Sequence, residues 1–405
     1  MKYIEGGVCA AKGFRAAGIH VGVKSHKTDK KDLALIVSDV PCAAAAVFTK
    51  NVVKAAPIHV DLAHLQSGRA RAIIANSGNA NACAPQGEEN AEKMCAAAAA
   101  AIGCAAEDVL VSSTGVIGQT INIGVIQNGM PALVEKLNYD GSDAASNAIM
   151  TTDTVKKEIA VSFEVGGKEV KIGGICKGSG MIHPNMGTML GFITTDCAIT
   201  HEMLEDALRD VVAKTFNRVT VDGDTSTNDM CVVLANGMAE NTLIEWKDED
   251  YDTFKAALDY ICRSLSRAIA GDGEGATKLI ECHVSGGKDD ATAKTVAKSV
   301  ICSSLLKAAM FGADANWGRV LCAIGYSGAD VDVTKIDVAF KSPKGEILVC
   351  KDGAGVPFSE EIAKEILLEK EIDIVVNLND GDTESVAWGC DLTYDYVKIN
   401  ADYRS

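Results

Sequence analysis

The chain has 405 residues, of which 47% are hydrophobic and 23% are charged, and its formal net charge is −16. This length and balance are typical of a folded globular protein whose core supports two or three lobes. The acidic charge argues against a nucleic-acid partner, because such partners are bound through a basic surface that displaces counterions.

The first predicted elements are short strands and one helix. Apolar runs at 33–37 and 72–75 predict buried strands, and the Ala-rich stretch at 88–102 predicts a helix. Residues 109–111 predict a further strand, which leads into a turn at 112–115. Strands and helices therefore alternate from the first part of the chain.

Amphipathic helices are predicted in the middle of the chain. Apolar side chains recur at helical spacing over 201–216, behind Thr200 as a candidate N-cap, and again over 253–270. The segment 292–311 predicts a third helix of this kind.

The last third has a different character. Residues 331–350 predict a hairpin that turns at Pro343, and Ser359 is placed to cap a helix that runs to residue 370. The apolar runs at 372–378 and 390–400 predict two more strands. The expected fold class is α/β in layers, an α+β sandwich, with a smaller C-terminal α+β lobe at about 285–395.

Cysteine usage and the N-terminal segment bear on the compartment. The chain has 14 Cys, and none forms a C-x-x-C pair. Several lie inside apolar runs, which predicts buried free thiols in a reducing cytosol: Cys231, Cys302, Cys322 and Cys350. The pair Cys282-His283 lacks companions at metal-ligand spacing, so we expect no metal. The N-terminus is charged, and the longest apolar stretch, 94–106, is too short for a membrane helix. We therefore expect a cytoplasmic protein with no membrane contact.

One segment, 177–195, has an unusual order of residue types: KGSGMIHPNMGTMLGFITT. Two glycines and a proline precede the pair Gly187-Thr188, which is followed by the apolar, strand-like run 189–193. A flexible peptide bond therefore meets a rigid strand at a hydroxyl residue.

This arrangement suits self-cleavage by an N→O acyl shift. The Thr188 hydroxyl would attack the carbonyl of Gly187, and hydrolysis of the resulting ester would leave Thr188 as a new N-terminus. Its α-amine, with a reference pKa of about 8, would then act as the general base for its own hydroxyl. By spacing alone, a Thr before an apolar run more often simply begins a strand, so both interpretations stay open at this point.

Ordered blocks along the chain resemble the ornithine acetyltransferase family, also called the glutamate N-acetyltransferase family. The resemblance covers almost the full length, and its landmarks are the blocks 32–36, 76–82, 113–118, 150–154, 177–195, 221–229, 271–278, 314–319 and 399–403. The family often has Ala where this chain has His183 and Gly187, and often Thr where it has Ser405. Gly at position 187 should leave cleavage intact or ease it, whereas Ser405 is the weakest of the matches.

The resemblance implies a set of site residues. Cleavage would fall between Gly187 and Thr188, Thr188 would be the nucleophile, and Thr114 with Gly115 would form the oxyanion hole. The family's substrate contacts fall on Thr151, Lys177, Thr188, Glu274, Asn400 and Ser405.

We assign the physical roles of these contacts by residue type. Lys177 can pair with an amino-acid carboxylate or tune the amine of Thr188, and Glu274 can receive the cationic amine of ornithine. Asn400 and Ser405 can hydrogen-bond polar substrate atoms. By type and spacing alone, each would be an ordinary surface or turn residue.

The resemblance also implies a reaction and an assembly. The acetyl group of N2-acetylornithine would pass to glutamate through acetyl-Thr188, with no cofactor. Whether acetyl-CoA also serves as a donor, which would add amino-acid N-acetyltransferase activity, stays open, as does inhibition by arginine. The implied assembly is a heterotetramer of two alpha chains, residues 1–187, and two beta chains, residues 188–405.

Two other functions remain as alternatives. Water could replace glutamate as the acceptor, giving an N-terminal-nucleophile amidase or aminopeptidase on a related fold. The chain could also be an unprocessed amino-acid-binding protein.

Two local features lead to structural expectations. The acidic loop 222–229 lacks the Gly and the closing Glu of a calcium loop, so we expect a hydrogen-bonded structural loop, and we expect His183 to serve local packing.

Overall fold

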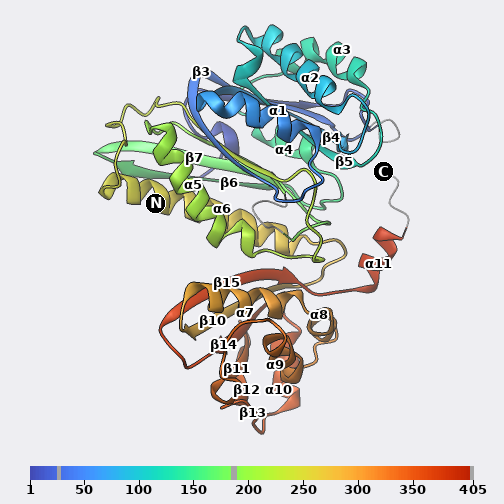
Figure 1. Cartoon of the computed structure of the whole chain (residues 1–405), viewed down its shortest axis with the longest axis vertical. Coiled ribbons are helices and arrows are strands. Elements are labelled where there is room, and N and C mark those ends of the chain that lie inside the picture. The colour runs from blue at the N-terminus through green and yellow to red at the C-terminus, as the bar shows by residue number, and fades with distance from the viewer. Residues whose placement is uncertain (25–28, 184–188, 402–405) are drawn as a thin grey trace.

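The computed structural model describes residues 1–24, 29–183 and 189–401, and these form two lobes, each built on its own sheet (Figure 1). The larger lobe contains the N-terminal strands and a nine-stranded sheet, and the smaller one contains a six-stranded sheet formed by the C-terminal part of the chain. The predicted α/β layered fold with a smaller C-terminal lobe is confirmed.

The sheet of the larger lobe has the strand order β1-β6-β7-β8-β9-β3-β4-β5, and β2 pairs with β3 beside this path. Its strands are β1 Lys2–Ile4, β2 Phe14–Ile19, β3 Leu33–Phe48, β4 Arg69–Asn79, β5 Val109–Val116, β6 Lys157–Val165, β7 Lys168–Lys177, β8 Leu190–Thr195 and β9 Met230–Ala235. Most pairs are antiparallel, but β4–β5 and β8–β9 are parallel.

Helices cover both faces of this sheet. They are α1 Ala56–His64, α2 Gly87–Ile102, α3 Ile123–Glu135, α4 Ser142–Ile149, α5 His201–Lys214 and α6 Glu249–Gly271. Apolar side chains of α5 and α6 pack on β6 to β9 in the largest core cluster, whereas α2 and α3 pack on β3, β4 and β5. Figure 1 shows α5 and α6 on the side of the sheet that faces the smaller lobe.

The predicted N-cap of α5 is confirmed, whereas α6 begins earlier than predicted. The Thr200 hydroxyl accepts from the Met203 N–H at the start of α5, as expected. The helix predicted at 253–270 begins four residues earlier, because the Asp248 carboxylate accepts from the Tyr251 N–H and fixes the first turn there.

The smaller lobe has the strand order β13-β12-β11-β14-β10-β15. Its elements are β10 Leu279–Gly287, α7 Asp290–Cys302, α8 Ser304–Phe311, α9 Trp317–Gly325, β11 Asp337–Ser342, β12 Gly345–Lys351, β13 Ala354–Gly355, α10 Glu360–Leu367, β14 Glu371–Asn377, β15 Thr383–Cys390 and α11 Tyr394–Asn400. Short 3-10 turns occur at Gly7–Cys9, Leu65–Ser67, Ala106–Asp108, Phe216–Arg218 and Val333–Lys335.

The sheet of the smaller lobe has two different faces. Ile280, Cys282 and Val284 of β10 point into a core shared with α7 to α10. The opposite face meets the larger lobe, where Trp388 of β15 is buried in the cluster that holds α6. The alternation of strand side chains therefore gives one face to the small lobe's core and the other to the junction.

Three predicted elements are wrong. The expected turn at 112–115 is strand, because β5 keeps its parallel pairing with β4 as far as Gly115 and Val116. The expected helix at 292–311 is two helices, which break at Ser303, whose hydroxyl caps α8 through the Leu306 N–H.

The third error concerns 390–400, which was expected to be a strand. Only its first residue, Cys390, belongs to β15, and Tyr394–Asn400 forms the helix α11. The Thr393 hydroxyl caps this helix by accepting a hydrogen bond from the Tyr396 N–H. The N-cap residue outweighs the apolar pattern here. The hairpin at 331–350 is confirmed with its turn at Pro343, although the strand begins only at Asp337.

The cysteines are free thiols, as the sequence predicted. All the cysteines are unpaired, and most are buried, including Cys231 and Cys350. Cys302 is only half-buried and Cys322 is exposed on α9, so the prediction of burial is met in part at Cys302 and is wrong at Cys322. Among the described residues, no helix has the length and apolarity to span a membrane.

Candidate active site

Thr114 and Lys177 come together although 63 positions separate them. Thr114 lies near the end of β5 and Lys177 is the last residue of β7, and both side chains are buried. The Lys177 ammonium donates to the Thr114 hydroxyl across 3.4 Å. The structure therefore joins two residues that the sequence assigned to different roles.

Gly115 occupies a backbone conformation that favours glycine. Its φ is +134°, and a Cβ at this position would lie 2.3 Å from the carbonyl carbon of Gly78 on the neighbouring strand. The register of β4 and β5 shifts at this point, between Gly78 and Asn79. The close strand approach beside Thr114 therefore requires Gly115.

A small pocket opens beside these residues. It is lined by Thr114, Lys177, Gly180, Met181, Ile182, Met189, Leu190, Ser226, Asn228 and Asp229. Met189 is the first described residue after the predicted cleavage position, while Gly187, Thr188 and Ser405 lie outside the described residues. Among the residues that the structure describes, the pocket thus brings the predicted oxyanion residue and lysine next to the segment that carries the predicted nucleophile.

Glu274 and Asn400 form a second group. Asn400, at the end of α11, donates its side-chain N–H to Glu274 Oε2 at 2.7 Å and a second one to the Tyr396 carbonyl. The Glu274 carboxyl lies over Gly180, where an added Cβ would come within 2.2 Å of its carboxyl carbon. Because Gly180 also lines the pocket, the Glu274 carboxyl borders the site that holds Lys177.

A buried ionic cluster, which sequence reasoning missed, links these groups. Lys157 Nζ lies 2.7 Å from Asp153 Oδ1 and 2.5 Å from Asp272 Oδ2, and the side chains of Lys157 and Asp153 are fully buried. Asp153 also accepts from the Thr151 N–H at 3.1 Å and the Gly178 N–H at 2.7 Å. We call Lys157, Asp153 and Asp272 the buried ionic cluster.

This cluster fixes the segments that carry predicted substrate contacts. Asp153 binds the backbone of Thr151 and of the residue after Lys177, while the Asp272 carbonyl accepts from the Ser179 hydroxyl. Burial by itself would raise the pKa of Asp153, but the nearby charges of Lys177 and Lys157 lower it to about 2. The signal for this cluster in the sequence was the polar residues inside the blocks 150–154 and 271–278.

The loop 222–229 is held by hydrogen bonds, as expected. The Asp222 carboxylate accepts from the backbone N–H groups of Met181, Ile182 and Asp224 at 2.6–3.1 Å. Asn228 donates to the carbonyls of Ala80 and Ser113, so it ties the loop to the end of β5. These bonds hold the loop in place in the wall of the pocket.

His183 also behaves as expected from the sequence. Its Nδ1 lies 3.1 Å from the Thr220 hydroxyl and 3.6 Å from the Cys302 thiol. Burial and the positive charge of Lys298 lower its pKa to about 4, so the imidazole is neutral near pH 7. The imidazole therefore packs locally between Thr220 and the end of α7.

A family of known proteins matches nearly the whole of this chain. The model of the ArgJ family matches residues 15–405. The chain belongs to the ArgJ family. The "Arginine biosynthesis bifunctional protein ArgJ" of Caldanaerobacter subterraneus is 48% identical, with all of both chains covered. "Arginine biosynthesis bifunctional protein ArgJ 1" of Clostridium acetobutylicum is 50% identical over 97% of this chain and 96% of its own.

One solved structure with this name is also similar. A crystal structure of arginine biosynthesis bifunctional protein ArgJ from Bacillus halodurans has 52% sequence identity and a TM-score of 0.51, and it covers 53% of this chain and 99% of its own. Membership of the ArgJ family confirms the resemblance that the ordered sequence blocks indicated.

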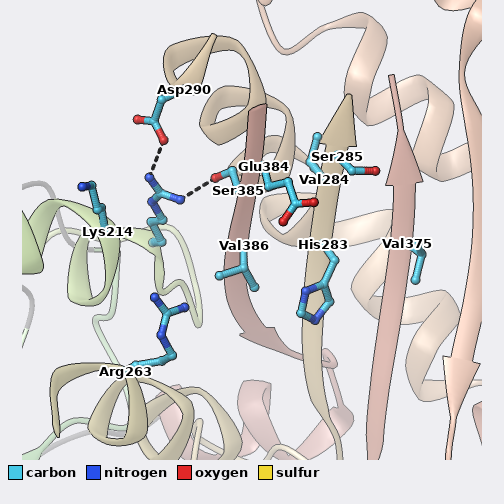
Figure 2. Close-up of a pocket in the computed structure, with 11 residues that line it drawn as sticks. Lys214, Arg263, His283, Val284, Ser285, Asp290, Val375, Glu384, Ser385 and Val386 are labelled. Atoms are coloured by element: carbon cyan, nitrogen blue, oxygen red, sulfur yellow. Dashed lines mark hydrogen bonds and ion pairs between the residues drawn. The ribbon is translucent and has the colours of Figure 1, made fainter. Parts of the chain in front are cut away.

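A larger pocket of this ArgJ-family chain, about 550 Å³, lies at the junction of the lobes (Figure 2). Arg218 donates there to Ser385 Oγ at 2.6 Å and to Asp290 at 2.8 Å, which connects the 3-10 turn after α5 to the smaller lobe. None of the predicted site residues that the structure describes lines this pocket. The hydrogen bonds of Arg218 in this pocket hold the two lobes together.

His283, on the rim of this larger pocket, has acidic neighbours that the sequence did not reveal. Its Nε2 lies 3.6 Å from a carboxylate oxygen of Glu281 and 3.5 Å from one of Asp373. Among the described residues, Glu281, His283 and Asp373 have their side-chain ligand atoms close enough together to hold a metal ion. Hydrogen bonds to Asp373 and Glu281 raise the pKa of His283 to about 9, which favours a bound proton. Glu281 also accepts from Arg267 and from the Trp388 ring N–H. This group is therefore an ion-pair network.

Proposed function

We propose that this chain cuts itself between Gly187 and Thr188 and then moves the acetyl group of N2-acetylornithine to glutamate through acetyl-Thr188. Acetyl transfer in arginine biosynthesis goes with membership of the ArgJ family, so the proposal concerns how this chain performs it. The observation that carries the proposal is the pocket in which Thr114, Lys177 and Met189 meet.

The first half of the reaction forms the acetyl-enzyme. The Thr188 hydroxyl attacks the acetyl carbonyl and passes its proton to the Thr188 α-amine, and the carbonyl oxygen becomes negatively charged. Thr114 and Gly115 stabilise that oxyanion, and the charge of Lys177, 3.4 Å from the Thr114 hydroxyl, supports it. The bond to ornithine then breaks, and the departing amine takes the proton from Thr188.

The second half of the reaction reverses these steps with glutamate. Its amine attacks the ester carbonyl of acetyl-Thr188 and gives N-acetylglutamate, and the Thr188 oxygen recovers a proton. Glu274, which Asn400 holds at 2.7 Å, receives the side-chain ammonium of ornithine, and Thr151 and Ser405 contribute polar contacts. All bonds formed and broken belong to the substrates and Thr188, so the reaction needs neither a metal nor another cofactor.

One observation supports cleavage into an alpha chain, 1–187, and a beta chain, 188–405. The solved Bacillus halodurans chain covers only 53% of this chain although nearly all of that chain is matched, and the proposed beta chain has about the same share. The strands on either side of the cut, β7 and β8, are antiparallel neighbours from Ile172 opposite Thr195 to Lys177 opposite Leu190.

This pairing bears on what happens after the cut. Because β8 lies between β7 and β9 inside one sheet, the two fragments share a continuous core and stay associated. We propose that two such pairs form the heterotetramer that the resemblance implied, and that the enzyme acts in the cytoplasm.

The decisive experiment combines protein chemistry with an activity assay. The purified protein should give two bands on a denaturing gel, and N-terminal sequencing of the larger fragment should begin at Thr188. Incubation with N2-acetylornithine should add the mass of one acetyl group to that fragment, and Thr188→Ala should abolish both cleavage and transfer. An active protein that remains one uncut polypeptide would disprove the proposal.

Two further assays define the donor and the acceptor. Release of ornithine should depend on added glutamate, whereas release that ignores glutamate would indicate an amidase. Replacing N2-acetylornithine by acetyl-CoA, with glutamate as acceptor, measures whether the chain also has amino-acid N-acetyltransferase activity.

A further inference from the structure

Three side chains that can bind a metal ion lie together on the face of the smaller lobe's sheet that meets the larger lobe. They are Glu281 and His283 of β10 and Asp373 of β14. His283 also lines the larger pocket at the junction of the lobes (Figure 2). The proposed acetyl transfer gives none of the three a role.

The strand register explains why these side chains meet. β10 and β14 are parallel neighbours, and Glu281 pairs with Asp373 across them. Side chains two positions apart lie on the same face of a strand, so His283 shares the face of Glu281. Between them Cys282 points the other way, into the core of the smaller lobe. The third group comes from a strand distant in sequence, which is why spacing along the chain gave His283 no companion.

The separations of the three ligand atoms suit a small ion bound between them. His283 Nε2 lies 3.6 Å from Glu281 Oε2 and 3.5 Å from Asp373 Oδ1, and the three atoms lie within 4.8 Å of one another. The first two separations exceed the range of about 2.7–3.2 Å that is typical of N–H···O hydrogen bonds. Two ligands at about 2.0–2.1 Å from a tetrahedral zinc ion lie about 3.4 Å apart. The spacing therefore fits groups that share an ion.

Two donors fix the orientation of the most buried ligand. Glu281 Oε1 accepts from Arg267 Nε at 2.6 Å, and Glu281 Oε2 accepts from Trp388 Nε1 at 3.1 Å. A carboxylate oxygen has two lone pairs, so Oε2 can accept from Trp388 and still bind an ion. Hydrogen bonds of this kind orient the carboxylates that bind metal ions in proteins.

The charges around the three ligands favour a divalent cation. Besides the two carboxylate ligands, Glu371 lies 3.1 Å from Arg267, so three carboxylates surround this one guanidinium. Arg263, which lines the same pocket, is paired with Asp259 at 3.1 Å. With a neutral His283 the group has a surplus of two negative charges, which one divalent cation neutralises.

We propose that Glu281, His283 and Asp373 bind one zinc ion, with water from the junction pocket as the fourth ligand. Zinc accepts imidazole and carboxylate ligands in tetrahedral geometry, whereas magnesium and calcium prefer six or more oxygen ligands. His283 binds the ion through Nε2 in its neutral form, and the proton that it held passes to solvent. In the metal-free protein the same side chains form the ion-pair network of the junction.

The ion strengthens the junction of the lobes. It connects β10 to β14 and fixes Glu281, whose other oxygen holds Arg267 on α6 of the larger lobe. A ligand that binds only the folded protein raises the temperature of unfolding. The inference does not depend on the proposed function, because the junction pocket and the pocket of Thr114 and Lys177 share no residue among those described.

The test is calorimetric titration of the full-length, chelator-treated protein with zinc chloride. The wild type should bind one zinc ion per chain at this site. Asp373→Asn and His283→Gln should each weaken that binding about 100-fold or more, because loss of a supporting contact alone costs about 10-fold to 100-fold. Zinc at about one hundred times its Kd should raise the unfolding midpoint of the wild type by about 2–4 °C and leave that of Asp373→Asn unchanged. Magnesium chloride and calcium chloride should not displace the zinc.

Glu371→Gln provides a matched control. Glu371 precedes Asp373 by two positions on the same face of β14 and contacts Arg267, but it lies outside the ligand group. The substitution removes the same charge as Asp373→Asn. Because an exposed charge contributes about 0–1 kcal/mol, zinc affinity should change less than about fivefold.

The outcomes decide whether the three residues form the site. Equal losses in Glu371→Gln and Asp373→Asn would indicate general attraction of a cation and overturn the inference. Zinc binding that persists in both Asp373→Asn and His283→Gln would place the ion elsewhere, for example on the exposed thiols of Cys83 and Cys322, and would overturn it as well. A wild type that binds no zinc contradicts it directly. Circular dichroism spectra that match the wild type's show that the variants are folded.

Discussion

Replacing Lys157 by Met tests whether the buried ionic cluster holds the active site together. The Lys157 side chain is fully buried and its Nζ contacts Asp153 at 2.7 Å and Asp272 at 2.5 Å. Met fills a similar volume but removes the charge between two carboxylates. Breaking a buried ion pair from one side costs about 3–5 kcal/mol, because the remaining charge stays buried without a partner.

The neighbouring residue supplies the comparison. Lys156 is about half exposed, and it pairs with Asp143 at 2.6 Å on the surface, where an ion pair contributes about 0–1 kcal/mol. Lys156→Met should therefore leave stability nearly unchanged, although it makes the same substitution one position earlier. The difference between the two variants measures the effect of burial.

Stability is measured by thermal unfolding of the cleaved protein. A loss of about 3–5 kcal/mol should lower the midpoint of Lys157→Met by about 4–6 °C relative to the wild type. Because Asp153 binds the Thr151 and Gly178 N–H groups, KM for N2-acetylornithine should rise as well, and Lys157→Arg should recover part of it. If Lys157→Met and Lys156→Met unfold within one degree of each other, the cluster does not carry the energy assigned to it.

Three further predictions follow from the site and the lobe junction. Thr114→Val should lower kcat roughly 100-fold to 1,000-fold, because it removes one oxyanion donor; an unchanged rate of acetyl-enzyme formation would remove Thr114 from that role. Gly115→Ala should cost about 1–3 kcal/mol from its positive φ and more from the clash with the Gly78 backbone, seen as a lower unfolding midpoint and as loss of activity. Gly118→Ala, which also has a positive φ but open space around it, should pay only the backbone cost and keep activity. His283→Gln should be less stable than the wild type in urea at pH 6, and this gap should close as pH rises through about 9, where folded His283 loses the proton that Asp373 and Glu281 hold. A gap that persists at pH 10 would show that the histidine acts by packing.

Figure 1 shows α11 leaving the smaller lobe and returning beside the larger one. Its residue Asn400 reaches Glu274, which follows α6 of the larger lobe. The sequence placed Asn400 at the end of a strand, but the Thr393 cap makes a helix, and only this helix aims Asn400 at the carboxyl. The residue was identified by family resemblance, whereas its means of reaching the site came from the fold.

By itself the sequence determined the local elements whose signals lie within a few residues. The Thr200 cap, the amphipathic stripes of α5 and α6, and the turn at Pro343 need only their neighbours, so they could be read in advance. The ordered blocks also indicated the family and the residues Thr114, Gly115, Thr151, Lys177 and Glu274, because motif order along a chain is visible without a fold.

Only the tertiary structure decided which of these residues meet. The contact between Lys177 and Thr114 joins the ends of β7 and β5, and the pairing of Lys157 with Asp272 spans 115 positions. Burial is likewise a property of the packed molecule: it raises the pKa of Asp229 and isolates its Oδ2, and no spacing rule predicts either. Desolvation depends on every element that surrounds a group, and this is why the buried ionic cluster became visible only in three dimensions.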